Sequence, residues 1–398
     1  MVLRKYWLKL LESAWSRKSV VWLSGVRRVG KTFLCQSIPQ IEYFDCELPR
    51  VRRQMEDPEG FLSKLQNKRI VLDEIHRLPN PSEFLKIIAD HFHSIRAIAT
   101  GSSTLQASSR FWDTLSGRKT QVWLTPMISQ DLIDFGNQDL RYRFLRGGLP
   151  PFFLSPEFPE VDFQEWIDSF WAKDIQELFR LERRHSFQKL MELLFIQSGG
   201  IFEATRFAGP CEVSRSTISN YLAVLEATWV IHVIRPFSSR RSGEIISAPK
   251  TYAFDTGFVC YFRDWHQLRE DDLGLLWEHW VLNEVHSVLQ APVVHYWRDK
   301  RGHEVDFILT LRGQEPIAIE CKWKEKQFEP TNMAAFRNQY PAGQNWIVCQ
   351  DVDRNFTRSF DKFKAEFISI EELSKRIDRL VHHENLKKEE GKSKEDPR

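Results

Sequence analysis

The chain has 398 residues, more than a single hydrophobic core usually organises, so its length predicts two or three domains. Apolar residues make up 42% and charged residues 28%, and no apolar run approaches the roughly 20 residues that a bilayer span requires. A net charge of +2 is too small to indicate a nucleic-acid partner by itself. Composition therefore predicts a soluble globular protein and excludes insertion into a membrane.

We do not expect the first residues to be an export signal. Residues 1–19 place leucines and tryptophans at helical spacing, without a long apolar stretch followed by small residues. Six cysteines lie far apart with no CxxC pair, which argues against a disulfide framework and against a zinc ribbon. We therefore expect a cytoplasmic protein.

The first third of the chain, residues 1–128, alternates short apolar runs with helical stretches. The runs SVVWLSG, QIEYFDCE, RIVLDEI, SIRAIATGSS and TQVWLTPM read as strands. This alternation is typical of a parallel sheet flanked by helices, so we expect an α/β domain here.

A phosphate-binding loop is predicted at residues 25–32, GVRRVGKT, which match GxxxxGK[ST] between an apolar strand and a helix. Glycines in such a loop let backbone N–H groups face phosphates, and the helix N-terminus adds positive potential. Lys31 would reach the β- and γ-phosphates of ATP, and Thr32 would bind Mg²⁺. The predicted nucleotide-binding residues of this region are Gly25, Val29, Gly30, Lys31, Thr32 and Phe33.

A strand that ends in two acids supports this prediction. In RIVLDEI, Asp73 is expected to assist Mg²⁺ and Glu74 to polarise the attacking water. After the next strand, Ser102 is a candidate sensor of the γ-phosphate, although a helix cap explains this serine equally well. Arg118 is a candidate arginine finger toward a neighbouring subunit, which would make the protein a homo-oligomer, or else an ordinary surface arginine.

Residues 129–198 are helical and aromatic, which predicts a helical connector. Residues 199–262 predict a winged helix-turn-helix, with a helix beginning after Ser214, then a strand, a basic loop and another strand. In this arrangement Arg215 on the helix, with Arg240 and Arg241 in the loop, would contact DNA. Winged folds also bind proteins, so a structural or protein-binding module is the alternative.

A carboxylate interrupts the apolar run GHEVDFIL at Asp306, and the next strand, PIAIECKWK, carries Glu320 and Lys322 on one face. These three side chains, joined by Glu278 from the preceding helix, fit a metal site: two carboxylates bind a divalent cation and the lysine assists an attacking water. The alternative is a structural ion pair. We therefore expect a nuclease-like α/β domain at residues 263–381.

The order of motifs resembles a bacterial and archaeal family of AAA-type ATPases joined to a C-terminal domain of unknown function, with a winged helix and a PD-(D/E)xK restriction-endonuclease-like end. The resemblance rests on GVRRVGKT, VLDEIHRLP, ATGSS, LSGR, GGLPPFF, KTYAFDTGF, GLLWEHWVLNE, YWRDKRGHEVDFIL and IAIECKW. It implies ATP binding at Gly30, Lys31 and Thr32, with Asp73 and Glu74 as the Mg²⁺-binding and water-activating acids. Departures are Ser116 in LSGR, Pro151 in GGLPPFF and Cys321 in ECK.

Two functions follow from these patterns. The first is an ATP-hydrolysing protein that uses Mg²⁺ and acts on DNA, with a metal-dependent nuclease activity in its C-terminal domain. The alternative is a nucleotide-switched DNA- or protein-binding regulatory protein whose nuclease-like domain is catalytically inert. Residues 382–398 lack apolar periodicity and are expected to be a disordered tail.

Overall fold

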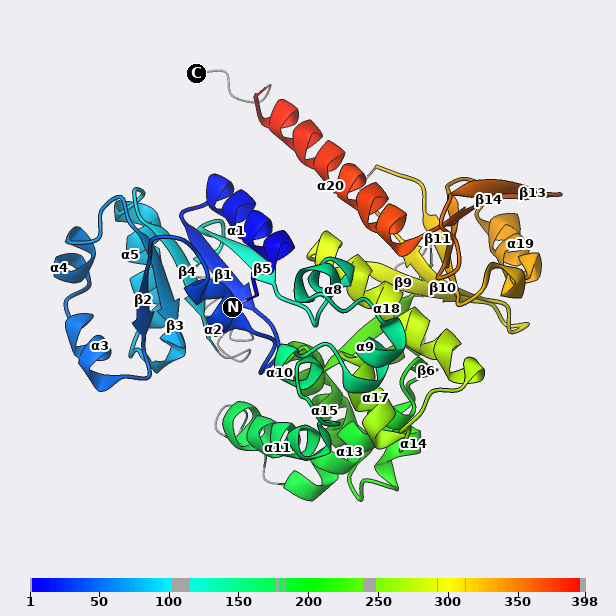
Figure 1. Cartoon of the computed structure of the whole chain (residues 1–398), viewed down its shortest axis with the longest axis horizontal. Coiled ribbons are helices and arrows are strands. Elements are labelled where there is room, and N and C mark those ends of the chain that lie inside the picture. Colours follow the sequence, from blue (N-terminus) through cyan, green and yellow to red (C-terminus); the bar gives the residue numbers. More distant parts are fainter. Residues whose placement is uncertain are drawn as a thin grey trace. The chain divides into compact units, whose positions relative to one another are not determined.

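The computed structural model describes residues 2–101, 115–176, 179, 181, 183–238, 248–291, 293–311 and 313–393. The chain forms two compact units (Figure 1). Unit 1 comprises Met1–Met191 and Cys211–Ile231, and unit 2 comprises Glu192–Pro210 and His232–Arg398.

Unit 1 is built on a five-stranded, fully parallel sheet in the order β2-β3-β4-β1-β5. Its strands are β1 (Val20–Ser24), β2 (Ile41–Asp45), β3 (Arg69–Asp73), β4 (Arg96–Thr100) and β5 (Lys119–Trp123). All five residues of β1 are buried. Because the strands are parallel, the loop after β1 and the acid at the end of β3 lie at the same edge of the sheet. The predicted parallel α/β domain is confirmed.

Helices alternate with the strands of this sheet along the chain, and further helices follow its last strand (Figure 1). Those of the sheet region are α1 (Lys5–Arg17), α2 (Lys31–Gln36), α3 (Pro49–Gln54), α4 (Pro58–Ser63) and α5 (Pro81–His91), with a 3₁₀ turn at Ile75–Arg77. Those that follow are α8 (Ser129–Phe135), α9 (Leu140–Arg146), α10 (Pro150–Phe153), α11 (Glu160–Phe170), a π-helical segment (Trp171–Gln176), α13 (Arg184–Ile196) and α15 (Arg215–Ala227). Residues 129–198 are thus helical wherever the structure describes a regular element, as the sequence predicts.

Unit 2 contains a nine-stranded mixed sheet in the order β13-β14-β12-β11-β10-β9-β7-β8-β6. Its strands are β6 (Gly200–Ile201), β7 (Ile231–Pro236), β8 (Lys250–Ala253), β9 (Val294–Arg298), β10 (Glu304–Leu309), β11 (Ile317–Lys322), β12 (Asn345–Cys349), β13 (Phe356–Phe360) and β14 (Phe363–Ile368). Its helices are α14 (Ala204–Ala208), α17 (Thr256–Phe262), α18 (Glu270–Leu289), α19 (Pro330–Gln339) and α20 (Ile370–Ser393), with a 3₁₀ turn at Glu325–Gln327.

The predicted hairpin of β10 and β11 is present and antiparallel. Met333 and Phe336 of α19 pack in one hydrophobic cluster with Val305 and Ile308 of β10. The β10–β11 ladder pairs Phe307 with Ile319 and extends from there toward Leu309. The segment before Phe307 lies beside a register shift against β9, so β10 is irregular where its acid stands.

The segment predicted as a separate winged domain, residues 199–262, is divided between the units. Its helix, α15, belongs to unit 1, whereas β6, β7 and β8 join the nine-stranded sheet of unit 2. β7 pairs in parallel with β9, far along the chain, instead of forming a wing with β8 alone. Five of the six residues of β7 are buried or partly buried. The physical reason is that a larger sheet buries more apolar surface than a two-stranded wing.

The prediction of a disordered tail from residue 382 also differs from the structure, because α20 continues to Ser393. The tail is rich in glutamate and lysine, which are good helix formers, so a helix that starts on apolar residues extends through them. Within the part of the chain that the structure describes, no helix is both long and apolar enough to cross a membrane.

Candidate functional site

The loop after β1 has the backbone that a phosphate cradle requires. Gly25 and Gly30 have φ of +145° and +100°, and a side chain on Gly25 would collide with the backbone carbonyl of Leu124. Arg28 also adopts a left-handed φ of 61°. Since α2 begins at Lys31 directly after Gly30, the N–H groups at its first turn face the loop.

The amine of Lys31 is held by two carbonyls of the same loop. Its Nζ donates to the oxygens of Gly25 at 2.8 Å and Val26 at 3.1 Å. Burial lowers the pKa of Lys31, although the negative charge of Glu74 opposes this shift. Among the described residues, no carboxylate lies within ion-pair distance of this ammonium group, which is therefore suited to bind an incoming anion.

The acid at the end of β3 is tied to the loop through hydroxyl groups. Thr32 Oγ1 donates to Asp73 Oδ2 at 2.8 Å, and the hydroxyls of Tyr43 and Thr100 also donate to the Asp73 carboxylate. Asp73 is 4% exposed. Thr32 and Asp73 thus present oxygen donors side by side, which fits the hard-oxygen preference of Mg²⁺.

Glu74 stands next to this pair in a left-handed conformation with φ of 52°. Its backbone N–H donates to Thr100 Oγ1 at 3.1 Å, and its Oε2 lies 3.2 Å from His76 Nδ1. Burial acts to raise the pKa of Glu74, but the hydrogen bond from His76 and the charge of Lys31 outweigh it and lower the pKa. The glutamate is therefore held as a carboxylate that can accept a proton or a hydrogen bond from water.

Sequence reasoning missed Tyr43 and Thr100. Thr100 is the last residue of β4, the strand between β1 and β3, and a polar residue at that strand end is a usable signal. Tyr43 has no comparable signal, because its role depends on β2 pairing with β3.

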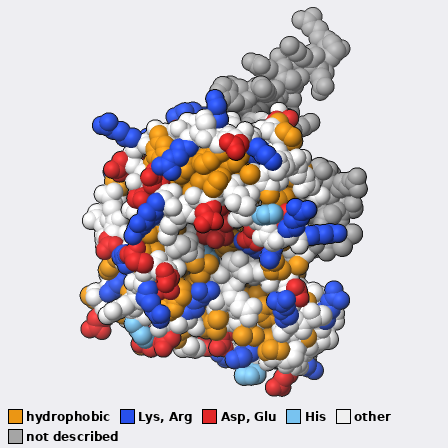
Figure 2. Space-filling model, turned by 90° about the vertical axis from the view of Figure 1, so that its right-hand side faces the viewer, with side chains coloured by type: hydrophobic (Ala, Val, Ile, Leu, Met, Phe, Trp, Pro, Cys, Tyr) orange, Lys and Arg blue, Asp and Glu red, His pale blue; other side chains and the backbone are white. Residues whose placement is uncertain are grey.

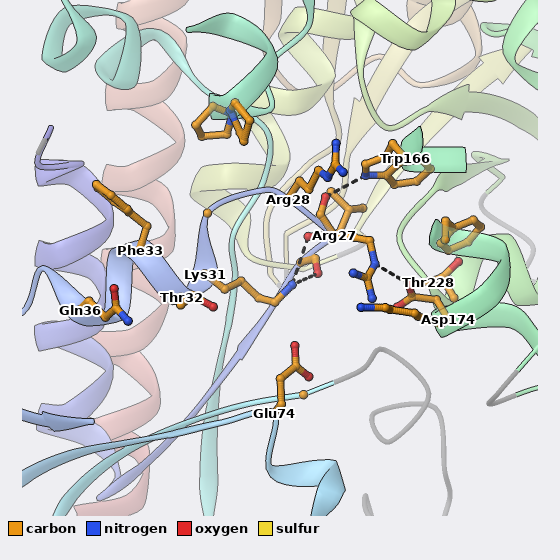
Figure 3. A pocket seen from close by; sticks show the side chains of 18 of the residues that line it. Arg27, Arg28, Lys31, Thr32, Phe33, Gln36, Glu74, Trp166, Asp174 and Thr228 are labelled. Atoms are coloured by element: carbon orange, nitrogen blue, oxygen red, sulfur yellow. Dashed lines mark hydrogen bonds and ion pairs between the residues drawn. The ribbon is translucent and has the colours of Figure 1, made fainter. Parts of the chain in front are cut away.

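A cavity of about 720 Å³ opens around these groups within unit 1 (Figure 3). Lys31, Thr32 and Glu74 line it from the sheet side, and Trp166 and Asp174 line it from the helical segments. In Figure 3 the side chains of Lys31 and Glu74 point into the same space. The pocket therefore combines the predicted phosphate loop and acids with helical residues that motif reasoning had not included.

Phe33 and Val29 occupy different places in this site. Phe33 lines the cavity and is 46% exposed, which suits contact with a ligand. The Val29 side chain is fully buried, so this residue takes part through its backbone: its carbonyl accepts from Arg4 Nη1 at 2.9 Å.

Arg4 connects the N-terminal segment to the loop and to α8. Its guanidinium pairs with the buried carboxylate of Asp131 at 2.6 Å, and Trp7 Nε1 donates to the same carboxylate at 3.1 Å. Together with the hydrogen bond to the Val29 carbonyl, this network connects the phosphate loop to α8 and stabilises its position. No motif signalled Arg4, since its partners lie up to 127 residues away.

Two further candidates from the sequence have different outcomes. Arg118 Nε lies 2.7 Å from Asp90 Oδ1 of its own chain, an ion pair that draws the guanidinium to the α5 helix. Its role toward a second subunit stays a prediction. Ser102 lies outside the residues that the structure describes.

In unit 2 the structure brings Asp306, Glu320 and Lys322 together. Lys322 Nζ lies 2.7 Å from Glu320 Oε2 and 3.8 Å from Asp306 Oδ2. Asp306 Oδ2 also accepts from the backbone N–H of Cys321 at 2.8 Å, where the β10–β11 ladder has ended. Glu320 is 2% exposed, and its Oε1 has no hydrogen-bond partner among the described residues.

Glu278 lies in a neighbouring group of charges. It accepts a hydrogen bond from the Tyr252 hydroxyl and lies 3.7 Å from Lys250 Nζ, which also pairs with Glu304. Burial, reinforced by Asp306, raises the pKa of Glu278 to about 7 and that of Glu320 to about 8. Among the residues that the structure describes, no three His, Cys, Asp or Glu side chains converge as metal ligands.

The candidate DNA-contacting helix, α15, has the predicted faces. Ser214 caps it by accepting from the Thr217 N–H, and its buried face consists of Ile218, Tyr221, Leu222 and Leu225. Arg215 is exposed, whereas Arg240 and Arg241 lie outside the described residues. On the face of the molecule in Figure 2, lysines and arginines are interspersed with acidic and apolar side chains.

The fold and the pocket of unit 1 have the features of a P-loop nucleotide-binding domain. In agreement, residues 17–133 match the family model described as an AAA domain. Residues 137–269 and 273–372 match two families described as domains of unknown function, DUF8612 and DUF4143. These matches leave the winged-helix and nuclease-like predictions untested.

Particular relatives have also been found. The chain is 28% identical over 331 residues to the uncharacterized protein Rv2008c of Mycobacterium tuberculosis, an overlap of 78% of this chain and 72% of the relative. An uncharacterized protein of Haemophilus influenzae is 21% identical over 294 residues, covering 65% of this chain and 72% of that protein. Among solved structures, the Walker-type ATPase PABY2304 of Pyrococcus abyssi is similar with a TM-score of 0.44 and 13% identity, over 66% of this chain and 96% of that one.

Proposed function

We propose that this protein binds ATP with Mg²⁺ in the unit 1 pocket and hydrolyses it. The observation that carries the proposal is that Lys31, Thr32 and Glu74 line one cavity at the carboxyl edge of a parallel sheet, with Asp73 hydrogen-bonded to Thr32. Ligands of such sheets bind at this edge, and phosphoryl transfer needs positioning and charge stabilisation more than covalent chemistry.

Each residue has a distinct part in this proposal. Lys31 and the N–H groups of the loop would bind the β- and γ-phosphates, and Thr32 and Asp73 would hold Mg²⁺, which neutralises phosphate charge when bound. The hydroxyls of Tyr43 and Thr100 keep the Asp73 carboxylate in place. Glu74, kept ionised by His76 and Lys31, would accept a proton from the attacking water.

The test is a calorimetric titration of the full chain with ATP and Mg²⁺. Lys31→Ala should weaken binding by about a hundredfold, because it removes a charged hydrogen bond to phosphate from a partly buried site. Lys68→Ala is the matched control, since Lys68 pairs with Glu42 on the surface of the same unit. Equal affinity of wild type and Lys31→Ala would overturn the assignment.

A second candidate function concerns unit 2: metal-dependent cleavage of DNA. It is supported by the convergence of Asp306, Glu320 and Lys322 and by the buried Glu320 Oε1, which has no hydrogen-bond partner in the described part of the chain and which a divalent cation would satisfy. Exposed Arg215 at the start of a capped helix supports contact with DNA phosphates. The competing proposal is a nucleotide-switched regulatory protein with an inert unit 2.

Cleavage of labelled single-stranded, duplex and branched DNA with Mg²⁺ or Mn²⁺, with and without ATP, separates these two proposals. If unit 2 is a nuclease, the wild-type chain cleaves at least one of these substrates and Asp306→Ala does not. If no substrate is cleaved while ATP is hydrolysed, the regulatory proposal is the one supported.

A further inference from the structure

The phosphate loop carries a second cation that no motif assigns. Arg27 lies two residues after Gly25, and its side chain is 29% exposed within the cavity lining. Its Nε donates to Asp174 Oδ2 at 2.9 Å, and its backbone carbonyl accepts from Trp166 Nε1 at 3.0 Å. The arginine is therefore held at both its backbone and its side chain by the helical segments of unit 1.

Arg27 lies in the same electrostatic neighbourhood as the proposed reacting groups. Its charge acts on both Lys31 and Glu74, lowering the pKa of each alongside stronger influences. In Figure 3 its guanidinium is directed into the pocket, on the side of Lys31 that faces Asp174. A ligand phosphate bound by Lys31 would therefore lie within the field of a second positive charge.

The contact between Arg27 and Asp174 involves one nitrogen of the guanidinium, which has further N–H groups that can bind phosphate. The contact with Asp174 engages Nε, whereas arginine grips a phosphate through paired N–H groups of its planar fork. By contrast, Arg118 is drawn to Asp90 through its own Nε outside the cavity lining. Within the described residues, Arg27 is therefore better placed to contact a phosphate in the cavity than Arg118, the candidate arginine finger from the sequence.

We propose that Arg27 binds the terminal phosphate of the nucleotide in cis, and that Asp174 is a positioning residue that aims its guanidinium. This inference rests on the proposed function. It implies that stabilisation of charge on the transferring phosphoryl group comes from the same chain as the phosphate loop.

The partly buried carboxylate of Asp174 is unfavourable beside a phosphate site, which fits a role in positioning Arg27. Its carboxylate lies in the π-helical segment Trp171–Gln176, and burial raises its pKa although Arg27 and Lys31 oppose the shift. Interruptions of this kind in a helix are frequent at functional sites. A carboxylate beside a polyphosphate repels it, so this position of Asp174 needs a compensating interaction. Its ion pair with Arg27 is such an interaction.

The first experiment compares affinities for a nonhydrolysable ATP analogue and for ADP, both with Mg²⁺, by calorimetry of the full chain. Arg27→Ala should weaken binding of the analogue by about tenfold to a hundredfold while changing the affinity for ADP by less than about threefold. Arg69→Ala, which breaks an ion pair with Glu12 at the other end of β3, is the matched control and should change neither.

An equal loss for both nucleotides, or no loss for either, would overturn the contact with the terminal phosphate. If Arg27→Ala does not fold, Arg27→Lys gives the same comparison, because it keeps the charge but not the planar fork; the analogue-to-ADP affinity ratio should fall by at least about threefold. An unchanged ratio in Arg27→Lys would then count against the proposal.

The second experiment tests Asp174 by steady-state kinetics. Asp174→Asn should lower kcat by at least about fivefold without raising KM for ATP, since it loosens Arg27 but removes a negative charge from the phosphate pocket. An unchanged kcat would overturn the positioning role, whereas a general structural defect would raise KM as well. Lys31→Ala distinguishes failure of the proposed function from failure of the inference about Arg27. If Lys31→Ala leaves nucleotide affinity intact, the proposed function fails. If Lys31→Ala abolishes nucleotide affinity and Arg27→Ala does not change it, only the inference about Arg27 fails.

Discussion

Each unit contains a lysine among carboxylates, and the two lysines are held in different ways. In unit 1, Lys31 donates to two backbone carbonyls, and the nearby acid Asp73 is occupied by hydroxyl groups. In unit 2, Lys322 lies 2.7 Å from the carboxylate of Glu320, itself almost fully buried. The ammonium group of Lys31 is thus held by backbone carbonyls alone among the described residues, whereas that of Lys322 is hydrogen-bonded to a buried carboxyl group.

The two lysines are therefore suited to different chemistry. A phosphate loop needs a cation without a carboxylate partner, and the backbone geometry of residues 25–31 provides one. A lysine paired to a buried acid serves equally as a structural element or as part of a metal site. Perturbing the two lysines in parallel is therefore the sharpest way to test the contrast.

The largest expected difference is in local stability. At a pH above about 8, where Glu320 is ionised, Lys322→Met should destabilise the β10–β11 hairpin by about 3 kcal/mol, because it leaves the buried carboxylate without its cation. Lys31→Met should change the stability around β1 by no more than about 1 kcal/mol, since it removes only hydrogen bonds to carbonyls.

Hydrogen exchange of peptides that cover β10–β11 and β1 measures both effects in the full chain. Lys324→Met is the control, because Lys324 pairs with Glu270 on the surface and should cost less than about 1 kcal/mol. Equal protection of the hairpin in wild type and Lys322→Met would remove the contrast between the units.

A smaller effect is expected from pH. Burial and Asp306 raise the pKa of Glu320 to about 8, above its value in an unfolded chain, so folded unit 2 holds an extra proton between about pH 5 and pH 8. The stability that this proton contributes is complete below about pH 5 and is lost as the pH rises through about 8.

Amide hydrogen-exchange rates of the β10–β11 hairpin should therefore increase from pH 5.5 to pH 8.5 by more than the intrinsic change of the exchange rate with pH. This additional increase should be smaller in Glu320→Gln. Glu315→Gln, at an exposed position nearby in sequence, should behave as wild type. The same pH dependence in Glu320→Gln and wild type would show that another group carries it.

The smallest expected effect concerns DNA. If α15 contacts a phosphate, Arg215→Ala should weaken binding of duplex DNA and reduce the slope of log affinity against log salt by about 1. Arg206→Ala, an exposed arginine paired with Glu203 on α14, is the control. An unchanged slope would favour a protein-binding role for the helix.

Much of unit 1 could be predicted from sequence because its signals are local. The strand, the glycine loop and the helix of the phosphate site lie within residues 20–36, and the acids end a strand of their own. Partners that depend on strand order could not be predicted: Tyr43 reaches Asp73 only because β2 pairs with β3. Arg4 and Asp174 are missed for the same reason, since each meets the loop across more than 20 residues of sequence.

In unit 2 the elements were predictable and their connections were not. Strands β7 and β8 lie where the apolar runs indicated, but β7 pairs with β9 in a nine-stranded sheet. Local propensity identifies a strand and cannot identify its neighbour, because pairing is decided by burial in the complete fold. The hairpin of Asp306 and Glu320 was predictable because its two strands are adjacent in sequence.

Glu74 is the residue proposed to activate water for ATP hydrolysis in the pocket of unit 1. The most direct test measures steady-state ATP hydrolysis and analogue binding for wild type and Glu74→Gln with Mg²⁺. The substitution should lower kcat by about a hundredfold or more while analogue affinity stays within about threefold. Turnover at the wild-type rate in Glu74→Gln, or a wild-type chain that binds ATP and does not hydrolyse it, would contradict this role of Glu74.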